Sequence, residues 1–449
     1  MIVSRVLTKS VVYHLSFLLL LLIPTLTQAA THVVTEGQSI ADALAISAPG
    51  DSVLVGPGDY FEQSMMMASG VTLAALSSQP EEFPRLIGDS AQTILHCENL
   101  TVGTHLEGLR FVGAIAEGQS GPIRGHGIYV VNSAMVISKC SFQSMRASYG
   151  AAIYVGKGIA PNIFDCSFVD GYADASGGAV SLVGAQGLVL DQCLFEGNAS
   201  LAGGSALNLA FQASATVVHC TFVDSDPINQ RLGDIQAWDD SSVELENCIV
   251  ANGSGRAIYG DFSSTPQLHC SDLIGNGGGD WLGAIAGQAE MAGNISLDPL
   301  FCGEDGDIGP FTLHEDSPCS AEANPECGIM GAFQIGCGNS AGTGGSEYTH
   351  ADEDILPTVT KLRGNYPNPF NPQTTIAFDL STPGHAAVDV YDLAGRLVRN
   401  LHSGVLAAGP HQVMWNGRGP DGRMSAAGVY FFRLKTEQVI DTQRMTLVK

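Results

Sequence analysis

A cysteine phrase that recurs at an almost constant interval constrains the fold of this chain more than any other feature. It consists of Cys, one variable residue and an apolar residue that is Phe in four copies, and successive cysteines are 26, 27, 27 and 28 residues apart. The phrase occurs at Cys140, Cys166, Cys193, Cys220 and Cys248. A period of roughly 20 to 50 residues indicates a repeat protein, in which each repeat packs on its neighbours.

A second phrase, in which apolar residues alternate with others, precedes each cysteine. Its copies cover residues 127–130, 152–155, 179–182, 206–209 and 234–237. Each repeat therefore contains two short strands separated by turns of Gly, Asn and Asp. No helical pattern of roughly ten to fifteen residues lies between them, which excludes a doubly wound α/β sheet. If one repeat forms one coil, equivalent residues stack about 4.8 Å apart, and inward Cys and Phe side chains form an apolar column.

These repeats resemble the right-handed parallel β-helix of pectate-lyase-like proteins, over residues 31–337. Residues 38–44 have the spacing of a short amphipathic helix, which would cover the open end of the apolar column. The segments 298–301, 317–319 and 331–333 are similar to the closing segment of that group, with Met330 where Ile is more usual. The resemblance implies an all-β solenoid.

Residues 1–30 have the pattern of a secretory signal peptide. Arg5 and Lys9 precede an apolar run at 15–23 and a small-residue cleavage site at 27–29. The run is short for a bilayer span, and no later stretch is apolar enough, so we expect an exported chain with no transmembrane segment after signal removal. Residues 338–355, rich in Gly and Ser and then in acidic residues, predict a flexible acidic linker.

The charge balance reverses beyond this linker. Residues 31–355 contain eight Lys and Arg against 39 Asp and Glu, whereas residues 356–449 contain ten against six. Nucleic-acid affinity comes mostly from cations that contact phosphates, so the formal net charge of −25 excludes a nucleic acid as partner. About seven short strands in the C-terminal segment predict a small immunoglobulin-like β-sandwich.

Four strings in residues 356–449 are specific enough to indicate a family. They are NYPNPFNP at 365–372, VYDLAGR at 390–396, WNG at 415–417 and GVY at 428–430. They resemble two related families, the C-terminal sorting domain of the type IX secretion system and the flagellar-hook-capping immunoglobulin-like domain. The resemblance implies a Gram-negative bacterial protein that the outer-membrane secretion machinery delivers to the cell surface. A plain sandwich with no sorting role is the alternative.

The 11 cysteines fall into two groups. The regular placement of the five phrase cysteines, one per coil, predicts buried, reduced side chains that stack. A second group in the closing segment lies outside the repeat and could form two disulfides, or could stay reduced. Its members are Cys302, Cys319, Cys327 and Cys337.

Catalysis on a polysaccharide would need paired carboxylates, or Ca²⁺ with a basic residue. The string around His126 and the pair Asp239 and Asp240 resemble parts of the polygalacturonase site, but their order in the chain is reversed and the other strings of that family are absent. A hydrolase of this type is therefore disfavoured. For a lyase, Arg146 or Lys157 would be the base.

Asp170, Asp174 and Asp224 are the candidate Ca²⁺ ligands, and no other cofactor is expected. Asp170 and Asp224 share an offset from their cysteines but are two coils apart, roughly 10 Å, with Gly197 between them. Ca²⁺ ligands lie about 2.3–2.6 Å from the ion, so this spacing is wide for one site. Solvated turn residues are the plainer interpretation.

Trp238 with Asp234, Asp239 and Asp240 is the best candidate for a carbohydrate-binding patch. An exposed aromatic ring can stack on a sugar, while carboxylates bond its hydroxyl groups; a Trp that covers the side of the column is the alternative. We therefore expect a non-catalytic, surface-displayed solenoid that binds a polysaccharide or cell-surface glycan. A polysaccharide lyase or glycoside hydrolase on the same fold is the second hypothesis, because a fold alone does not decide function.

Overall fold

The computed structural model describes residues 29–89, 91–113, 123–227, 232–303 and 310–337, and most residues between 360 and 448. In that last stretch the described ranges are 360–366, 370, 372, 374–382, 384–406, 409–419, 423–436 and 439–448. The predicted linker at 338–355 and nearly all of the predicted signal peptide lie outside them. The chain divides into two compact units, which are described separately.

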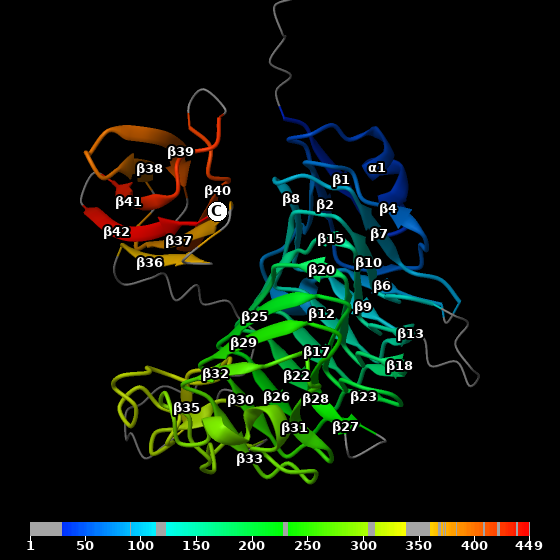
Figure 1. Cartoon of the computed structure of the whole chain (residues 1–449). Helices are drawn as coiled ribbons and strands as arrows, with labels where there is room; N and C mark the ends of the chain where they lie inside the picture. Colours follow the sequence, from blue (N-terminus) through cyan, green and yellow to red (C-terminus); the bar gives the residue numbers. More distant parts are fainter. Residues whose placement is uncertain are drawn as a thin grey trace, which may run out of the picture. The chain divides into compact units, whose positions relative to one another are not determined.

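The larger unit is a right-handed parallel β-solenoid of about ten turns, which confirms the predicted fold. Figure 1 shows its coils stacked in chain order from α1 (Ile40–Ile46) down to β33 (Asp272–Ile274). Each coil passes through sheet C, sheet A and sheet B, and in four coils also through a short sheet D. Every strand pair within these sheets is parallel, so equivalent residues of successive coils face each other.

Sheets A and B form two sides of the coil. The ten strands of sheet A are β1 (Thr31–Val34), β2 (Ser52–Val55), β5 (Thr72–Ala75), β8 (Thr104–Glu107), β11 (Met135–Ser138), β16 (Asn162–Phe164), β21 (Leu188–Asp191), β25 (Ser214–Val218), β29 (Ser242–Glu246) and β32 (Gln267–His269). The nine strands of sheet B are β3 (Asp59–Tyr60), β6 (Arg85–Ile87), β9 (Arg110–Val112), β12 (Ser141–Gln143), β17 (Ser167–Val169), β22 (Leu194–Glu196), β26 (Thr221–Val223), β30 (Ile249–Ala251) and β33.

Sheets C and D complete the coil. The eight strands of sheet C are β4 (Met65–Met66), β7 (Leu95–Glu98), β10 (Ile128–Val131), β14 (Ile153–Gly156), β19 (Val180–Val183), β24 (Leu207–Ala210), β28 (Gly233–Ala237) and β31 (Arg256–Gly260). Sheet D contains β13 (Arg146–Tyr149), β18 (Tyr172–Ser176), β23 (Ala199–Ser200) and β27 (Asp226–Pro227). Two short strands, β15 (Gly158–Ile159) and β20 (Ala185–Gln186), pair beside the turn from sheet C to sheet A.

A column of Phe rings fills the solenoid beneath sheet B. The ring centroids of successive coils are 4.8, 5.0, 4.7 and 4.4 Å apart, and the planes differ by less than 10°. The members are Phe111, Phe142, Phe168, Phe195 and Phe222. Apolar burial of this kind contributes roughly 25 cal/mol per Å², so the column is a main source of stability.

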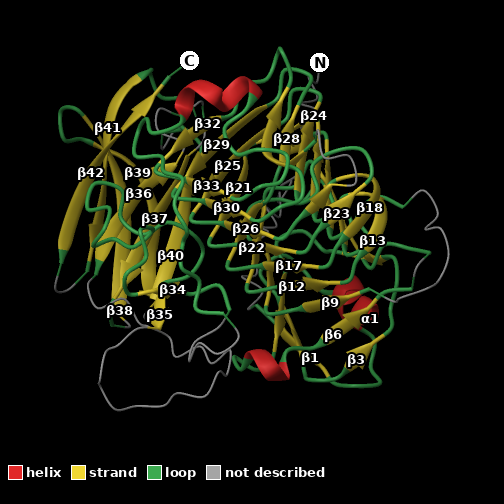
Figure 2. Ribbon diagram, turned by 90° about the horizontal axis from the view of Figure 1, so that it is seen from below, coloured by secondary structure: helices red, strands yellow, loops and turns green. Residues whose placement is uncertain are grey.

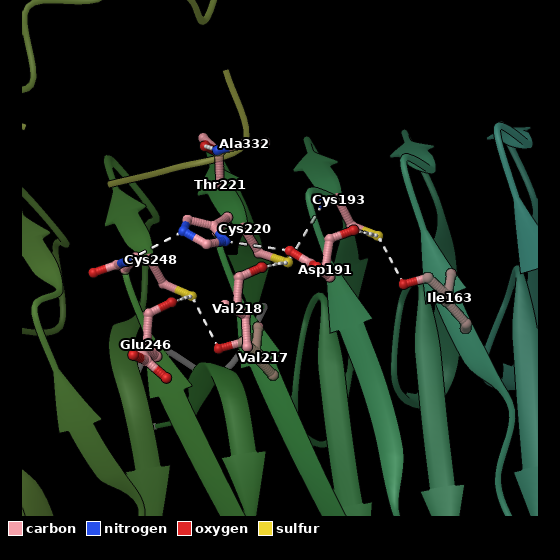
Figure 3. A network of polar contacts seen from close by, with 12 residues as sticks. Ile163, Asp191, Cys193, Val217, Val218, Cys220, Thr221, Glu246, Cys248 and Ala332 are labelled. Atoms are coloured by element: carbon pink, nitrogen blue, oxygen red, sulfur yellow. Dashed lines mark hydrogen bonds and ion pairs between the residues drawn. The ribbon is translucent and has the colours of Figure 1, made fainter. Parts of the chain in front are cut away.

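The five phrase cysteines stack at the corner between sheets A and B. All are buried and free, as predicted. Each thiol donates to the carbonyl oxygen two residues earlier, for example Cys193 to Asp191 at 3.4 Å and Cys248 to Glu246 at 3.3 Å (Figure 3). Burial raises the pKa of the Cys166 and Cys220 thiols well above the ordinary value, so both are protonated and unreactive at neutral pH.

The first coil is covered by α1, as the sequence predicts. Ile40, Ala43 and Leu44 of this helix are buried in the core. Ser39 caps it by accepting from the Asp42 N–H, and Glu62 accepts from the Ile40 N–H at 2.6 Å. A side chain from the next part of the coil therefore satisfies helix donors that would otherwise lack partners. The 3₁₀ helices η1 (Pro80–Glu82) and η2 (Gly283–Gln288) complete the helical content of the described residues.

Two disulfides fasten the closing segment, in a pattern that differs from the prediction. Cys302 pairs with Cys337, but Cys327 pairs with Cys270, which directly precedes Ser271 at a coil corner. Cys319 was grouped with the disulfide candidates and is instead a buried free thiol, which donates to Asp272 Oδ2 at 3.2 Å. The pairing could not be read from sequence, because connectivity depends on which cysteines the fold brings together. Strands β34 (Leu313–His314) and β35 (Ile335–Cys337) belong to this segment.

The smaller unit contains two antiparallel sheets around a common core (Figure 2). One sheet is β36 (Lys361–Tyr366), β37 (Thr374–Leu380) and β40 (Gly409–Trp415). The other is β39 (Leu397–Leu406), β38 (Gly384–Asp392), β41 (Gly428–Lys435) and β42 (Ile440–Leu447). Phe370, Phe378, Trp415 and Phe432 are buried between them. The predicted all-β composition of this unit is confirmed.

Candidate functional site

Trp238 lies where β28 ends and the chain turns towards sheet A. It follows β28 on the outer face of sheet C, is half-buried, and its ring is tilted against Phe211 with centroids 5.8 Å apart. Asp239 and Asp240 form the exposed turn that follows, with φ of 56° and 57°. Asp tolerates this left-handed conformation better than most residues. The Asp239 N–H donates to Asp261 Oδ2 at 2.9 Å, which fixes the turn on the next coil.

Asp234 is not part of this surface. Its side chain is fully buried, its Oδ1 accepts from Ser205 Oγ at 3.0 Å, and a Cβ built on Gly253 would lie 2.4 Å from its Oδ2. Burial raises the pKa of Asp234 well above its ordinary value. Of the four residues predicted for a sugar-binding patch, Asp239 and Asp240 are exposed and Trp238 is half-buried, whereas the Asp234 carboxyl lies in the interior.

The outer face of sheet C carries a row of polar and aromatic side chains, here named the sheet C row. Its residues occupy one register position on successive strands from β7 to β31. They are His96, Tyr129, Tyr154, Ser181, Asn208, Gln236 and Tyr259. The Tyr129 and Tyr154 rings stack with centroids 5.5 Å apart, so the row begins with aromatic rings and continues with hydroxyl and amide groups.

Three buried polar atoms of the sheet C row and of Trp238 have no hydrogen-bond partner among the described residues. They are Asn208 Oδ1, Gln236 Oε1 and Trp238 Nε1. Asn208 and Gln236 are only 2% and 5% exposed, and Asn208 uses its Nδ2 to donate to Ser181 Oγ at 3.1 Å. An unsatisfied buried polar atom costs about 1–3 kcal/mol, so this cluster is destabilising unless another molecule supplies partners.

Two cations lie on the coils next to Tyr154 of the sheet C row. The Arg124 guanidinium lies over the Tyr154 ring, 5.4 Å from its centroid, and 5.9 Å from the Tyr149 centroid. Lys157 follows β14 and is exposed. A Cβ built on Gly184 would lie 3.0 Å from Lys157 Cγ, so the lysine side chain extends along the turn of the next coil. A third guanidinium, that of Arg256, lies 5.9 Å from the ring centroid of Tyr259, the last residue of the row.

The candidate Ca²⁺ ligands do not converge. Asp170 and Asp224 follow equivalent strands two coils apart, and Gly197 lies between them, as expected from their offsets. Asp174 lies on β18, beyond the corner that Asp170 forms. Burial, and then the charges of Asp170 and Asp224, raises the pKa of Glu196 between them. No group of three His, Cys, Asp or Glu residues within the described ranges could hold a metal ion.

The polygalacturonase-like residues are also separate. His126 is fully buried, and Asp239 is exposed four coils further along, roughly 19 Å away at the coil spacing. Arg146, one of the two candidate bases, lies on sheet D with its guanidinium 4.4 Å from the Tyr172 ring centroid. General acid and base groups must reach the same reacting atoms, and these groups do not.

Sequence reasoning missed the residues that accompany Trp238, although the chain contains a signal for them. The third residue of each copy of the second phrase is Tyr129, Tyr154, Ser181, Asn208 or Gln236, between apolar neighbours. Because this position alternates with core residues, it had to face outwards. The first residue is Gly or Ala in four copies and Asp234 in the last. Alternation places it on the same face as the third residue, so the sequence pattern alone does not predict that Asp234 is buried.

Two family descriptions match parts of the chain. Residues 126–295 match the right handed beta helix region, and residues 366–438 match the FlgD Ig-like domain. No curated protein matches. No helix among the described residues is long and apolar enough to cross a membrane.

Three solved structures show weak similarity. Dimeric latent PorU from Porphyromonas gingivalis is 20% identical, with 20% of this chain and 9% of that chain covered and a TM-score of 0.18. PorZ, a bacterial surface component of the type-IX secretion system of the same organism, is 23% identical, with coverage of 21% and 13% and a TM-score of 0.16.

The third structure is full-length tailspike protein 2 from Escherichia coli O157:H7 bacteriophage CAB120. It is 11% identical, with 90% of this chain and 65% of that chain covered and a TM-score of 0.28. The chain thus spans 9%, 13% and 65% of the length of these three proteins.

Proposed function

We propose that this protein is a secreted, surface-displayed β-helix protein that binds an extracellular glycan without cleaving it. The observations that carry the proposal are the Phe211–Trp238 ring pair and, on the same coils, two buried amide groups whose oxygens have no partner among the described residues. The smaller unit is the export domain in this account.

The chemistry of the cluster suits a sugar. Trp and Phe rings offer apolar faces on which the C–H face of a pyranose packs, and a Trp N–H seeks an acceptor. The Asn208 and Gln236 oxygens seek donors, and hydroxyl groups are donors. Both oxygens are covered by neighbouring atoms in the free protein, so we expect the two amides to change rotamer when a ligand binds. A ligand that satisfies them would recover free energy that the free protein lacks.

The placement of titratable residues supports binding rather than cleavage. Asp239 and Asp240 are exposed, whereas His126 is buried four coils away. Chemical acceleration needs acid and base groups within hydrogen-bond reach of one bond. Turnover of polyuronides by the full chain, with or without Ca²⁺, would contradict this part of the proposal.

The binding test compares two aromatic substitutions in the full chain. Trp238→Ala should reduce affinity for a glycan identified on a panel by about tenfold or more, because a stacked ring and its N–H are lost together. Phe61→Ala is the matched control, since Phe61 is 69% exposed outside the sheet C row. Calorimetric titration that gives equal affinities for wild type and Trp238→Ala would reject this site.

Export by the C-terminal unit rests on its match to the FlgD Ig-like domain and on the four strings at 365–430. Deleting residues 356–449 should leave a folded solenoid, because linker-separated domains share few contacts. In the native host the truncated protein should accumulate in the periplasm. Its normal appearance at the cell surface would refute the sorting role.

A further inference from the structure

We propose that the ligand is a linear β-1,4-linked glycan without acidic groups, which lies parallel to the solenoid axis and packs every second sugar on Phe211 and then Phe262. This inference rests on the proposed glycan binding and adds the linkage of the ligand, its direction and a further binding residue, Phe262. It follows from the aromatic residues at three successive turns from sheet C to sheet A, here named the C–A turns.

The three C–A turns are held in register. The Gln212 N–H donates to the Asp239 carbonyl oxygen at 2.8 Å, and the Asp239 N–H donates to Asp261 Oδ2 at 2.9 Å, so each turn is bonded to the next. The strand register of β24, β28 and β31 places Phe211, Asp239 and Phe262 at equivalent positions. The two Phe residues are therefore two coils apart, roughly 10 Å.

Both Phe side chains present apolar surface that the fold does not bury. Phe262 is fully exposed and Phe211 is 55% exposed, and both lie outside the hydrophobic core. A single exposed apolar residue is ordinary on a protein surface, but two on one corner, beside the half-buried Trp238, form a strip of rings. The apolar face of a sugar packs on rings of this kind.

The backbone of Phe211 gives an independent indication. Its φ is 58°, in the left-handed region that a bulky residue rarely adopts. The residues at the same position on the preceding and following coils are Gly184 and Asp239, which have φ of 68° and 56° and tolerate this conformation. A Phe here, with half of its side chain exposed, is strained, and strained residues concentrate at functional sites.

The spacing of the two rings selects the linkage. In an extended β-1,4-linked chain, successive sugars are turned over, so every second sugar presents the same face to a flat surface. That repeat is close to two coil spacings, roughly 10 Å, so Phe211 and Phe262 meet the same face of sugars i and i+2. Asp239 lies between the two rings and can accept hydroxyl groups of the middle sugar. An α-1,4-linked glucan curves and does not follow a straight row.

The charges of the C–A turns disfavour an acidic glycan. The three turns contain three Asp and no Lys or Arg. They are residues 211–214, 238–242 and 261–265. Asp239 and Asp240 are exposed, so a polyuronide would meet like charges along the strip. Arg256 lies at the start of β31, whereas Phe262 follows its end, and Lys157 belongs to a coil before that of Phe211.

The first experiment is calorimetric titration of the full chain with hexasaccharides. Cellohexaose and maltohexaose are both built of glucose and differ only in linkage, β-1,4 against α-1,4, and xylohexaose and chitohexaose extend the β-1,4 series to other sugars. At least one β-1,4 hexasaccharide should bind about tenfold or more tightly than maltohexaose and than its own disaccharide, because only a longer chain reaches both rings. Equal affinity for maltohexaose would overturn the proposal.

Two substitutions then place the chain. Phe262→Ala should weaken binding of the preferred hexasaccharide by about tenfold and leave its disaccharide unaffected. Phe211→Asn should weaken binding without lowering the melting temperature, because Asn tolerates the left-handed conformation. Phe61→Ala is the matched control, since Phe61 is exposed on a coil near the other end of the solenoid.

The outcomes separate this inference from the proposed function. Unchanged affinity in Phe262→Ala, together with weaker binding in Trp238→Ala, would overturn the strip and leave glycan binding intact. Tighter binding of an oligogalacturonate than of every β-1,4 hexasaccharide would overturn the class of ligand, as would a wider panel in which only another linkage binds. Failure of all hexasaccharides and of the wider panel would overturn both proposals.

Discussion

The interior of the solenoid and the sheet C row belong to the same coils but differ in how their side chains repeat. Inside, identical residues stack, and the Phe column repeats one side chain at centroid distances of 4.4–5.0 Å. Outside, the row changes residue from coil to coil and leaves two nearly buried amide oxygens unpaired. The Phe column packs on copies of itself in the free protein, whereas two amide oxygens of the sheet C row have no partner among the described residues.

This difference between the inward and outward positions indicates which residues of the solenoid are constrained by stability. Parallel stacking with a fixed register rewards a side chain that packs on a copy of itself. Residues of an outward row need not pack on copies of themselves, so they can differ from coil to coil and contact a ligand. If the comparison is correct, interior substitutions should reduce stability with no specific effect on binding, and substitutions in the row should do the reverse.

The largest effect is expected for a ring in the middle of the column. Phe168 packs between Phe142 and Phe195, and Phe168→Ala should lower the free energy of unfolding by about 3–5 kcal/mol, because it removes a large buried side chain and leaves a cavity. Phe61→Ala, at an exposed aromatic residue, should change it by less than about 0.5 kcal/mol. If urea denaturation gave equal losses of unfolding free energy for Phe168→Ala and Phe61→Ala, the comparison would be wrong.

Two buried asparagines, one in the interior and one in the sheet C row, give a second test of the comparison. Asn198 is satisfied, since its Nδ2 donates to the Phe168 carbonyl at 2.8 Å and its Oδ1 accepts from the Gly171 N–H at 3.0 Å. Asn198→Ala should cost about 2–4 kcal/mol, because both backbone groups lose their partner inside the protein. Asn208→Ala removes an oxygen that has no partner among the described residues and one hydrogen bond, from Nδ2 to Ser181 Oγ, so it should cost about 1–2 kcal/mol, less than Asn198→Ala.

The same pair separates stability from binding. Asn208→Ala should weaken glycan binding, whereas Asn198→Ala should leave the affinity of the folded fraction unchanged. Denaturation and titration of both variants under one set of conditions measure this. A larger loss of stability for Asn208→Ala than for Asn198→Ala would show that the sheet C row is structural.

A buried carboxyl under the closing segment gives a pH-dependent test of the interior. Burial raises the pKa of Asp272 from 3.8 to about 6, and the carboxyl accepts from the Leu297 N–H at 3.1 Å. Because the folded pKa lies above the ordinary value, this group stabilises the fold fully below pH 3.8 and loses that contribution as pH rises through about 6. The effect is at most about 3 kcal/mol.

Asp272→Asn should remove this part of the pH dependence, and Asp316→Asn, at an exposed carboxyl of the same segment, should not. Melting temperatures of the three proteins between about pH 4 and pH 8 measure the difference. Parallel curves for wild type and Asp272→Asn would contradict a raised pKa at Asp272.

The sequence predicted the interior well because stacking imposes a period. The phrase cysteines and Phe142, Phe168, Phe195 and Phe222 are where the period places them. Phe111 extends the same column and escaped notice, because Leu109 occupies the position at which later coils have Cys.

The site was predicted less completely, since a row without a repeated residue produces no period. Trp238 was identified by its chemistry alone. Asp234 was grouped with it because the two are close in the chain, although the structure buries this carboxyl completely. Cys270 lies 57 residues before its partner Cys327, a separation that no local pattern reveals.

The most direct measurement is a crystal structure of the full chain with a bound oligosaccharide from the glycan panel. The account predicts a sugar ring on Trp238, with hydroxyl groups that donate to Asn208 Oδ1 and Gln236 Oε1. A well-occupied oligosaccharide on another face, with the side chains of the sheet C row unchanged, would contradict it.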